Sequence, residues 1–261
     1  MIISPVFVGG LGNRLFQLVN AIFLADLLGV KMIYKDLQLS DKMRFKNQLK
    51  YFKIEDALSG GHPSKYRITD IFDFEKSNDL QHETYKLASE SQFLSRQLDP
   101  KLQENIHLAG YYFNANIAEK VISDKKFPPW NSDFRPVNVP ITPYIAHIRV
   151  PYQYDNFTAS TSAFSRLNSI LREFPKEWTF FTNDSSKIPS DLLTHAKYVY
   201  GSEVDVYDTL KLSESAEILI MSCSTLSGWM AFLGNHKKVY CPKEYISSHG
   251  LSSISSKWHI Y

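Results

Sequence analysis

Residues 1–30, MIISPVFVGGLGNRLFQLVNAIFLADLLGV, contain a strand, a glycine-rich connection and a helix in succession. Residues 2–8 are apolar and rich in β-branched side chains, which indicates a buried strand that ends at two glycines. Apolar residues recur at helical spacing over 15–28, and Gly29 stands where a helix C-cap is expected. Residues 31–34 predict the next strand. This order predicts an α/β protein with a parallel, doubly wound sheet.

A second α/β unit is predicted after a proline-rich stretch. Five prolines fall in residues 128–143, and proline stiffens connections and ends helices. We therefore predict two domains, 1–140 and 141–261, of which the second is Rossmann-like. Its predicted strands are 144–150, 178–182, 197–200, 217–222 and 238–241, and its predicted helices are 163–173, 192–195, 208–215 and 226–233.

The composition excludes several classes of protein. Hydrophobic residues make up 44% and charged residues 21% of the 261 residues, as in an ordinary folded protein. A formal net charge of +2 gives no broad basic surface for nucleic acid. The two cysteines lack metal-ligand or disulfide-framework spacing. No apolar run reaches the roughly 18 residues of a membrane span, so we expect a cytoplasmic protein without membrane insertion.

The glycine-rich connection is a candidate phosphate or sugar site. Gly10, Gly12 and Asn13 lie between the predicted strand and helix. Glycine lets main-chain N–H groups approach a ligand closely, and a helix N-terminus favours negative charge. A tight turn without a ligand is the alternative.

In the second domain, His147 and Arg149 stand at the end of a predicted strand, where open α/β sheets bind their ligands. Arginine presents a planar fork of donors that suits a diphosphate. His147 by itself is more often a structural residue, but Arg149 beside it favours an anion site.

Two further strand ends carry polar groups. Asp184 follows the apolar run FFT, and its carboxylate could accept from N1–H and N2–H₂ of guanine or simply cap a helix. Ser224, Thr225 and Ser227 lie between a buried strand and a helix, where hydroxyl and amide groups suit phosphate. Capping by Ser224 or Thr225 is again the alternative.

Taken in order, these segments resemble the α-1,2-fucosyltransferase family (glycosyltransferase family eleven). GGLGNRLFQ (9–17) resembles the family's opening G-G-L-G-N-Q-M-F-Q, and GYYF (110–113) resembles G-Y-[FW]-Q. HIRVPY (147–152) corresponds to H-I-R-R-G-D, and FTND (181–184) to F-S-D-D. STLSGWMAFL (224–233) aligns without gaps on S-S-F-S-W-W-G-A-W-L.

The chain departs from that pattern at two positions. Val150 replaces the second arginine, and Tyr152 replaces the acid, with Asp155 three residues out of register. The related protein O-fucosyltransferases have a single-arginine H-L-R-x-G form and a T-D-S element that resembles Asn183-Asp184-Ser185. Arg149 is the position that all these relatives share.

The resemblance implies a GT-B-like α/β architecture, in which two Rossmann-like domains face a cleft. The N-terminal domain (1–140) would take the acceptor, and the C-terminal domain (141–261) the GDP-sugar. It also implies catalysis without a metal or other cofactor. Arg149, with His147 beside it, would stabilise the departing diphosphate. The remaining donor-binding residues would be Gly10, Gly12, Asn13, Asp184, Ser224, Thr225 and Ser227.

The implied reaction is inverting transfer of L-fucose from GDP-β-L-fucose to a hydroxyl of a glycan acceptor. A general base is needed for this reaction, and Asp155 and His107 are the candidates. Val150 and Tyr152 leave open a transferase for another GDP-sugar, such as rhamnose or mannose. A non-catalytic relative that binds nucleotide or glycan is the third possibility.

Overall fold

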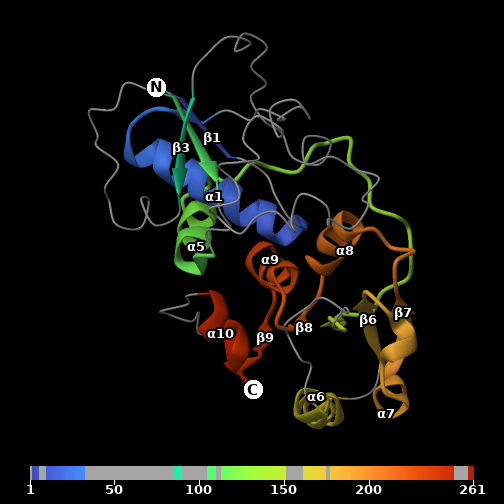
Figure 1. Cartoon of the computed structure of the whole chain (residues 1–261). Coiled ribbons are helices and arrows are strands. Elements are labelled where there is room, and N and C mark those ends of the chain that lie inside the picture. Colours follow the sequence, from blue (N-terminus) through green and yellow to red (C-terminus); the bar gives the residue numbers. More distant parts are fainter. Residues whose placement is uncertain are drawn as a thin grey trace. The chain divides into compact units, whose positions relative to one another are not determined.

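The chain divides into two compact units, unit 1 (Met1–Phe134) and unit 2 (Arg135–Tyr261) (Figure 1). The computed structural model describes residues 2–5, 10–32, 85–89, 105–109, 113–150, 161–174, 177–249 and 258–261. The division falls inside the proline-rich stretch. Some residues named above lie outside the described ones, namely Gly9, Gly110, Tyr111, Tyr112, Tyr152, Asp155 and the side chain of His107.

In the described part of unit 1, four parallel strands form a sheet in the order β2-β1-β4-β3. These strands are β1 (Ile2–Pro5), β2 (Lys31–Met32), β3 (Tyr85–Ser89) and β4 (Asn105–Ala109). Helix α1 (Leu11–Leu27) connects β1 to β2, and α5 (Ala115–Ser123) packs against α1. The strand–helix–strand opening predicted from the first thirty residues is confirmed.

Helix α1 starts earlier than its apolar periodicity predicted. The main-chain hydrogen bond of its first turn runs from the Arg14 N–H to Gly10 O at 3.1 Å, so Gly12 and Asn13 are helical. The end is as predicted: Gly29 has φ +62°, and the next amide, of Val30, donates to Ala25 O at 2.8 Å. Only glycine adopts this left-handed conformation readily, so the helix stops here.

In the described part of unit 2, six strands form one sheet whose neighbours are all parallel, in the order β10-β9-β8-β5-β6-β7. They are β5 (Tyr144–Ile148), β6 (Trp178–Thr182), β7 (Ala196–Tyr200), β8 (Ile218–Ile220), β9 (Lys238–Cys241) and β10 (Trp258–Ile260). Numbered within the unit, the order is 6-5-4-1-2-3. This is the order of doubly wound dinucleotide-binding sheets.

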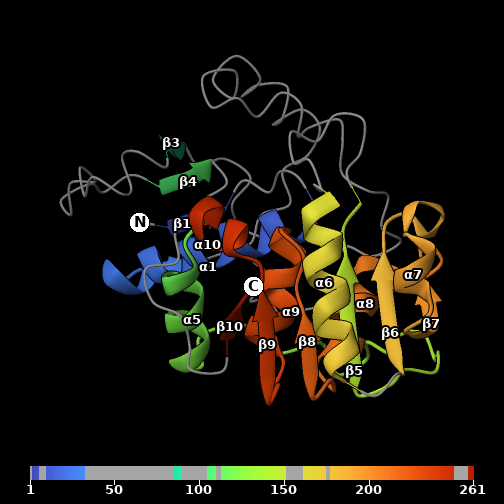
Figure 2. The same cartoon turned by 90° about the horizontal axis from the view of Figure 1, so that it is seen from below.

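Helices cover both faces of the unit 2 sheet. They are α6 (Thr161–Glu173), α7 (Ser190–Leu193), α8 (Val206–Ser213), α9 (Thr225–Leu233) and α10 (Lys243–His249). Figure 1 shows α8 and α9 on one face and α6 on the other, and Figure 2 shows α6 lying along the strands. All five residues of β6 are therefore buried, which explains its continuous apolar sequence.

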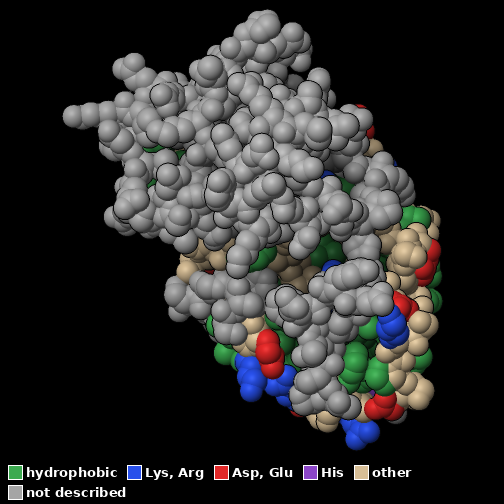
Figure 3. All heavy atoms as spheres, viewed as in Figure 1, with side chains coloured by type: hydrophobic (Ala, Val, Ile, Leu, Met, Phe, Trp, Pro, Cys, Tyr) green, Lys and Arg blue, Asp and Glu red, His purple; other side chains and the backbone are tan. Residues whose placement is uncertain are grey.

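Charged side chains of both signs lie side by side on the described surface of unit 2. Lys197 pairs with Glu177, and Lys237 with Glu217, across neighbouring segments. On the face drawn in Figure 3, blue and red side chains are accordingly interspersed over the coloured part of the surface. Exposed pairs of this kind stabilise a fold by less than about 1 kcal/mol each. None of the described helices is both long enough and apolar enough to span a bilayer.

Helix α9 is fixed against α10 by a close approach at Gly228. A Cβ atom on this residue would lie 1.7 Å from Oη and 2.6 Å from Cζ of Tyr245, whose side chain is fully buried. Only glycine leaves room for this ring. The contact matters for the site below, because α9 carries the predicted phosphate-binding residues at its N-terminus.

The Gly228→Ala variant should therefore unfold more easily. In an exposed helix this change stabilises by about 1 kcal/mol, but here the overlap with a buried ring should destabilise by about 2–3 kcal/mol. Urea unfolding followed by circular dichroism measures the difference. In the control Gly201→Ala, the added Cβ meets only the carboxylate end of Glu203 at 3.0 Å, and a change within about 0.5 kcal/mol is expected. A higher midpoint for Gly228→Ala would contradict this packing.

Candidate functional site

The strand order of unit 2 reverses between β5 and β8. The chain leaves β5 toward α6 and leaves β8 toward α9, which cover opposite faces of the sheet (Figure 1). A crevice outside the carboxyl ends of the strands is expected at such a reversal, and ligands bind there in open α/β sheets. His147 and Arg149 come from the end of β5, and Ser222 and Ser224 follow β8. The topology thus brings two sequence-predicted segments, 75 residues apart at His147 and Ser222, to one place.

Three side chains, two of them buried and that of Ser222 half-buried, form a cluster at this point. Nδ1 of His147 lies 2.5 Å from Oγ of Ser227 and 3.1 Å from Oγ of Ser222. The two hydroxyl oxygens are 2.9 Å apart, and the Ser222 amide donates to Oγ of Ser227 at 3.1 Å. In one neutral tautomer Nδ1 accepts a hydrogen bond from a serine hydroxyl, and in the other it donates its own N–H to one. The cluster joins the end of β5 to the first turn of α9.

His147 is held in its neutral form. Burial, and to a smaller extent the neighbouring Arg149 charge, lower the pKa of the imidazole to about 3. A group with this pKa is not a proton donor near neutral pH, and its Nδ1 is already engaged. In the described structure His147 therefore links the end of β5 to the start of α9, and the catalytic role expected for it stays a prediction.

The N-terminus of α9 presents the predicted phosphate ligands in two different ways. Ser227 is fully buried, and its hydroxyl points into the His147 cluster. Ser224 is the N-cap residue with extended backbone (φ −141°, ψ 138°), but among the described contacts its hydroxyl does not cap the helix. Thr225 begins the helix. The first-turn N–H groups have no intrahelical acceptor, and the partial positive charge of this helix end favours an anion.

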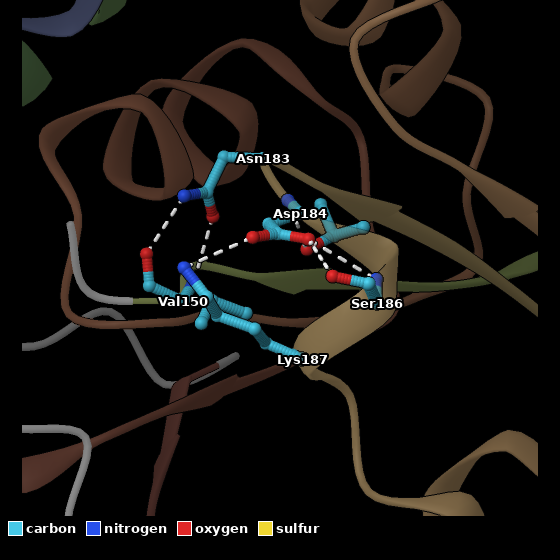
Figure 4. A network of polar contacts seen from close by, with 6 residues as sticks. Val150, Asn183, Asp184, Ser186 and Lys187 are labelled. Atoms are coloured by element: carbon cyan, nitrogen blue, oxygen red, sulfur yellow. Dashed lines mark hydrogen bonds and ion pairs between the residues drawn. The ribbon is translucent and has the colours of Figure 1, made fainter.

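Asp184 is the N-cap of a short 3-10 helix, Ser185–Lys187 (Figure 4). Its Oδ1 accepts from the amide and hydroxyl of Ser186 at 3.1 and 2.6 Å, and its Oδ2 lies 3.0 Å from Nζ of Lys187. The Ser186 hydroxyl, followed by Lys187, lowers the pKa of the carboxyl. The capping alternative is thus what the structure shows. Binding guanine would require Ser186 and Lys187 to give up these contacts, and that role stays a prediction.

Unit 1 contains the remaining predicted donor-binding residues. Gly10 is the N-cap of α1 with extended backbone, and a Cβ there would meet nothing within 4 Å. Gly12 is buried in the first turn and Asn13 is half-buried beside it. This helix end has the form of an anion site, with no acidic residue in its first turn. The part that these residues play toward the donor stays a prediction.

The described residues include no group of three or more His, Cys, Asp or Glu side chains placed to hold a metal ion.

One buried acid, Asp208, was not recognised from the sequence. Asp208, in the first turn of α8, is fully buried, and its Oδ1 accepts from the Val137 amide at 3.0 Å. This buried carboxylate ties the segment before β5 to α8. Its sequence context, a helix start, gave no sign of burial.

Comparison with known proteins shows likeness in structure without likeness in sequence. No family model matches the chain, and no curated protein matches its sequence. Among solved structures, a mutant of Arabidopsis thaliana FUT1 in complex with GDP is 11% identical, with a TM-score of 0.50 over 94% of this chain and 71% of that one. NodZ alpha-1,6-fucosyltransferase from Bradyrhizobium, soaked with GDP-fucose, is 12% identical, with a TM-score of 0.49 over 91% and 93%. POFUT1 in complex with GDP-fucose is 10% identical, with a TM-score of 0.47 over 90% and 94%.

Identities this low show the fold alone. The likeness to FUT1, together with the parallel sheets, confirms the expected α/β, GT-B-like fold class. The cleft expected between the two domains stays a prediction.

The buried neutral His147 should make stability depend on pH. The unfolded pKa is about 6.5 and the folded pKa about 3. Between these values the unfolded chain binds a proton here that the folded chain does not. The free energy of unfolding should therefore fall with decreasing pH by about 1.4 kcal/mol per pH unit from this group.

Urea unfolding of the wild type and of His147→Gln at a series of pH values tests this. Below about pH 6.5, the free energy of unfolding of the wild type should fall by about 1.4 kcal/mol more per pH unit than that of the variant. Above about pH 7.5 the two should change with pH in parallel. Parallel curves throughout, or an imidazole NMR titration with its midpoint near 6.5, would show that His147 is not held neutral.

Proposed function

We propose that the protein is a glycosyltransferase that moves L-fucose from GDP-fucose to a hydroxyl of a glycan acceptor. The observation that carries the proposal is the contact of His147, two residues before Arg149, with Ser222 and with Ser227 in the first turn of α9, at the strand-order reversal of a Rossmann-type sheet. Arg149 supplies a full positive charge, and the helix end supplies N–H donors. Together they form a site for a diphosphate.

The chemistry follows from where charge develops. Cleavage of a sugar–diphosphate bond leaves negative charge on the departing diphosphate. A fixed guanidinium and fixed N–H groups stabilise this charge without having to reorganise. We propose that they do so without a divalent cation, and that Ser224 and Thr225 bind the phosphates. Ser227 would act indirectly, through its contacts with Ser222 and His147.

Two observations support a GDP-sugar as the donor. The FUT1 structure that shares the fold is a complex with GDP. The segments GGLGNRLFQ, HIR and STLSGWMAFL also resemble the α-1,2-fucosyltransferase family. Asp184 is the proposed reader of guanine, which requires its carboxylate to exchange Ser186 and Lys187 for the base. Transfer from a β-linked donor to an α-fucoside implies inversion, with a general base that deprotonates the acceptor.

A different GDP-sugar is the second candidate. Val150 occupies the position of the family's second arginine. Its main chain bonds Asn183, and its side chain belongs to the buried hydrophobic core of unit 2. One charge fewer beside the diphosphate favours a change in donor or linkage over a loss of nucleotide binding. A non-catalytic relative would bind GDP but transfer nothing.

A donor panel tests the proposal. The purified protein is incubated with GDP-fucose, GDP-mannose or GDP-rhamnose and a mixture of glycan acceptors, and released GDP is measured with and without EDTA. GDP-fucose should give the highest acceptor-dependent release, and EDTA should leave the rate unchanged, because Arg149 and α9 neutralise the diphosphate.

Each other outcome identifies a different error. Preference for another sugar selects the second candidate. Loss of activity in EDTA that Mn²⁺ restores contradicts metal independence. If UDP inhibits release as strongly as GDP does, or if Asp184→Asn keeps the preference for GDP, Asp184 does not read the base. GDP binding without release from any donor indicates a non-catalytic protein.

A further inference from the structure

The side chain of Asn183 binds both main-chain polar groups of Val150. The Val150 amide donates to Oδ1 at 2.7 Å, and Nδ2 of Asn183 donates to the Val150 carbonyl oxygen at 2.7 Å. Figure 4 shows Asn183, from the end of β6, facing Val150 in this two-pronged arrangement. Both bonds are short, and they connect positions 33 residues apart.

This contact extends the β5–β6 pairing beyond the point where the main chain can continue it. The ladder runs to Ile148 opposite Thr182. Val150 is 5% exposed, so its N–H and C=O need partners. Pro151 follows in the sequence and has no N–H to offer to a ladder. The side-chain amide of Asn183 has one donor group and one acceptor, as a peptide unit has. It bonds the two main-chain groups of Val150 as a neighbouring strand would.

Arg149 is thereby fixed from both sides. The residue after it, Val150, is held by Asn183. Two residues before it, His147 is held by Ser222 and Ser227. A guanidinium that must meet a diphosphate with a planar fork needs a fixed main chain, because a shift of about 1 Å can cost about a hundredfold in rate.

Asn183 is itself held in place by the turn that follows. The Asp184 amide donates to Oγ1 of Thr182 at 3.2 Å, and the Asp184 carboxylate bonds Ser186 and Lys187. These contacts fix the main chain on the C-terminal side of Asn183, while β6 fixes the N-terminal side. The main chain on both sides of Asn183 is therefore held by contacts within unit 2 (Figure 4).

We propose that Asn183 is a positioning residue that sets the direction of Arg149 toward the diphosphate. The inference rests on the proposed function, because it needs a diphosphate at Arg149. Asparagine is required because the position must both donate and accept. Aspartate accepts only and would place a carboxylate oxygen against the Val150 carbonyl, and leucine does neither.

A double-mutant cycle on GDP affinity tests this role. Calorimetric titration with GDP compares the wild type, Asn183→Leu, Arg149→Ala and the double variant, with circular dichroism as the check of folding. Asn183→Leu should weaken GDP binding about tenfold or more in the wild-type background and less than about twofold in the Arg149→Ala background. Residues that act through one another are not additive.

An equal loss in both backgrounds, or no loss in either, would overturn the inference while leaving the proposed function standing. Failure of the wild type to bind GDP would overturn both. Guanidinium chloride at millimolar concentration should restore GDP affinity to Arg149→Ala more than to Asn183→Leu, because only the first lacks the charged group.

If Asn183→Leu does not fold, Asn183→Asp replaces it, measured at low and high salt. Misplacement of Arg149 should persist at high salt, whereas simple repulsion between the new charge and GDP would be screened, and recovery at high salt would overturn the inference. Asn114→Asp is the matched control, because in the contacts described Oδ1 of Asn114 accepts from the Asn116 and Ile117 amides. Aspartate keeps both bonds, and GDP affinity should not change.

Discussion

The contact between Nδ1 of His147 and the hydroxyls of Ser222 and Ser227 is the interaction on which the candidate site depends. It joins the end of β5 to the first turn of α9. The chain continues from β5 to α6, which covers the opposite face of the sheet from α9. It adds a side-chain link to the main-chain pairing of β5 with β8, the strand that leads into α9. Burial keeps the imidazole neutral, with a pKa of about 3, so the link does not change with pH in the neutral range. Gly228 adds to the same constraint by letting Tyr245 pack tightly against α9.

Much of the fold could be predicted from the sequence, because its strands are apolar runs with clear ends. The predicted bounds of β6 and β9 agree with the structure to the residue, and the parallel order follows from the alternation of strands and helices. The start of α1 was predicted four residues too late, because Gly12 and Asn13 are weak helix formers whose conformation depends on packing. Helix α10 and strand β10 were missed, since they are short and tertiary contacts hold them, such as Lys243 N–H to Tyr261 O at 3.0 Å.

The candidate site could be predicted in location but not in detail. Strand ends can be found in a sequence, and topology then brings them together. The partners of individual side chains depend on geometry between distant segments, so no local pattern shows that Ser227 points into the protein or that Asn183 holds Val150. For Asp184 the local signal was correct: an acid before two serines is typical of a cap, and the structure shows that cap.

The central claim is that a nucleoside diphosphate binds between Arg149 and the start of α9, and the two cysteines allow a direct measurement. Cys223 is half-buried between Ser222 and Ser224, whereas Cys241 is fully buried and desolvation raises the pKa of its thiol to about 12. Iodoacetamide should therefore modify Cys223 in preference to Cys241, because the thiolate is the reactive form. Mass spectrometry of each cysteine over time, with and without saturating GDP, gives the two rates. The account predicts that GDP slows modification of Cys223 severalfold. An unchanged rate at Cys223 in a sample that calorimetry shows to be saturated with GDP would place the nucleotide elsewhere.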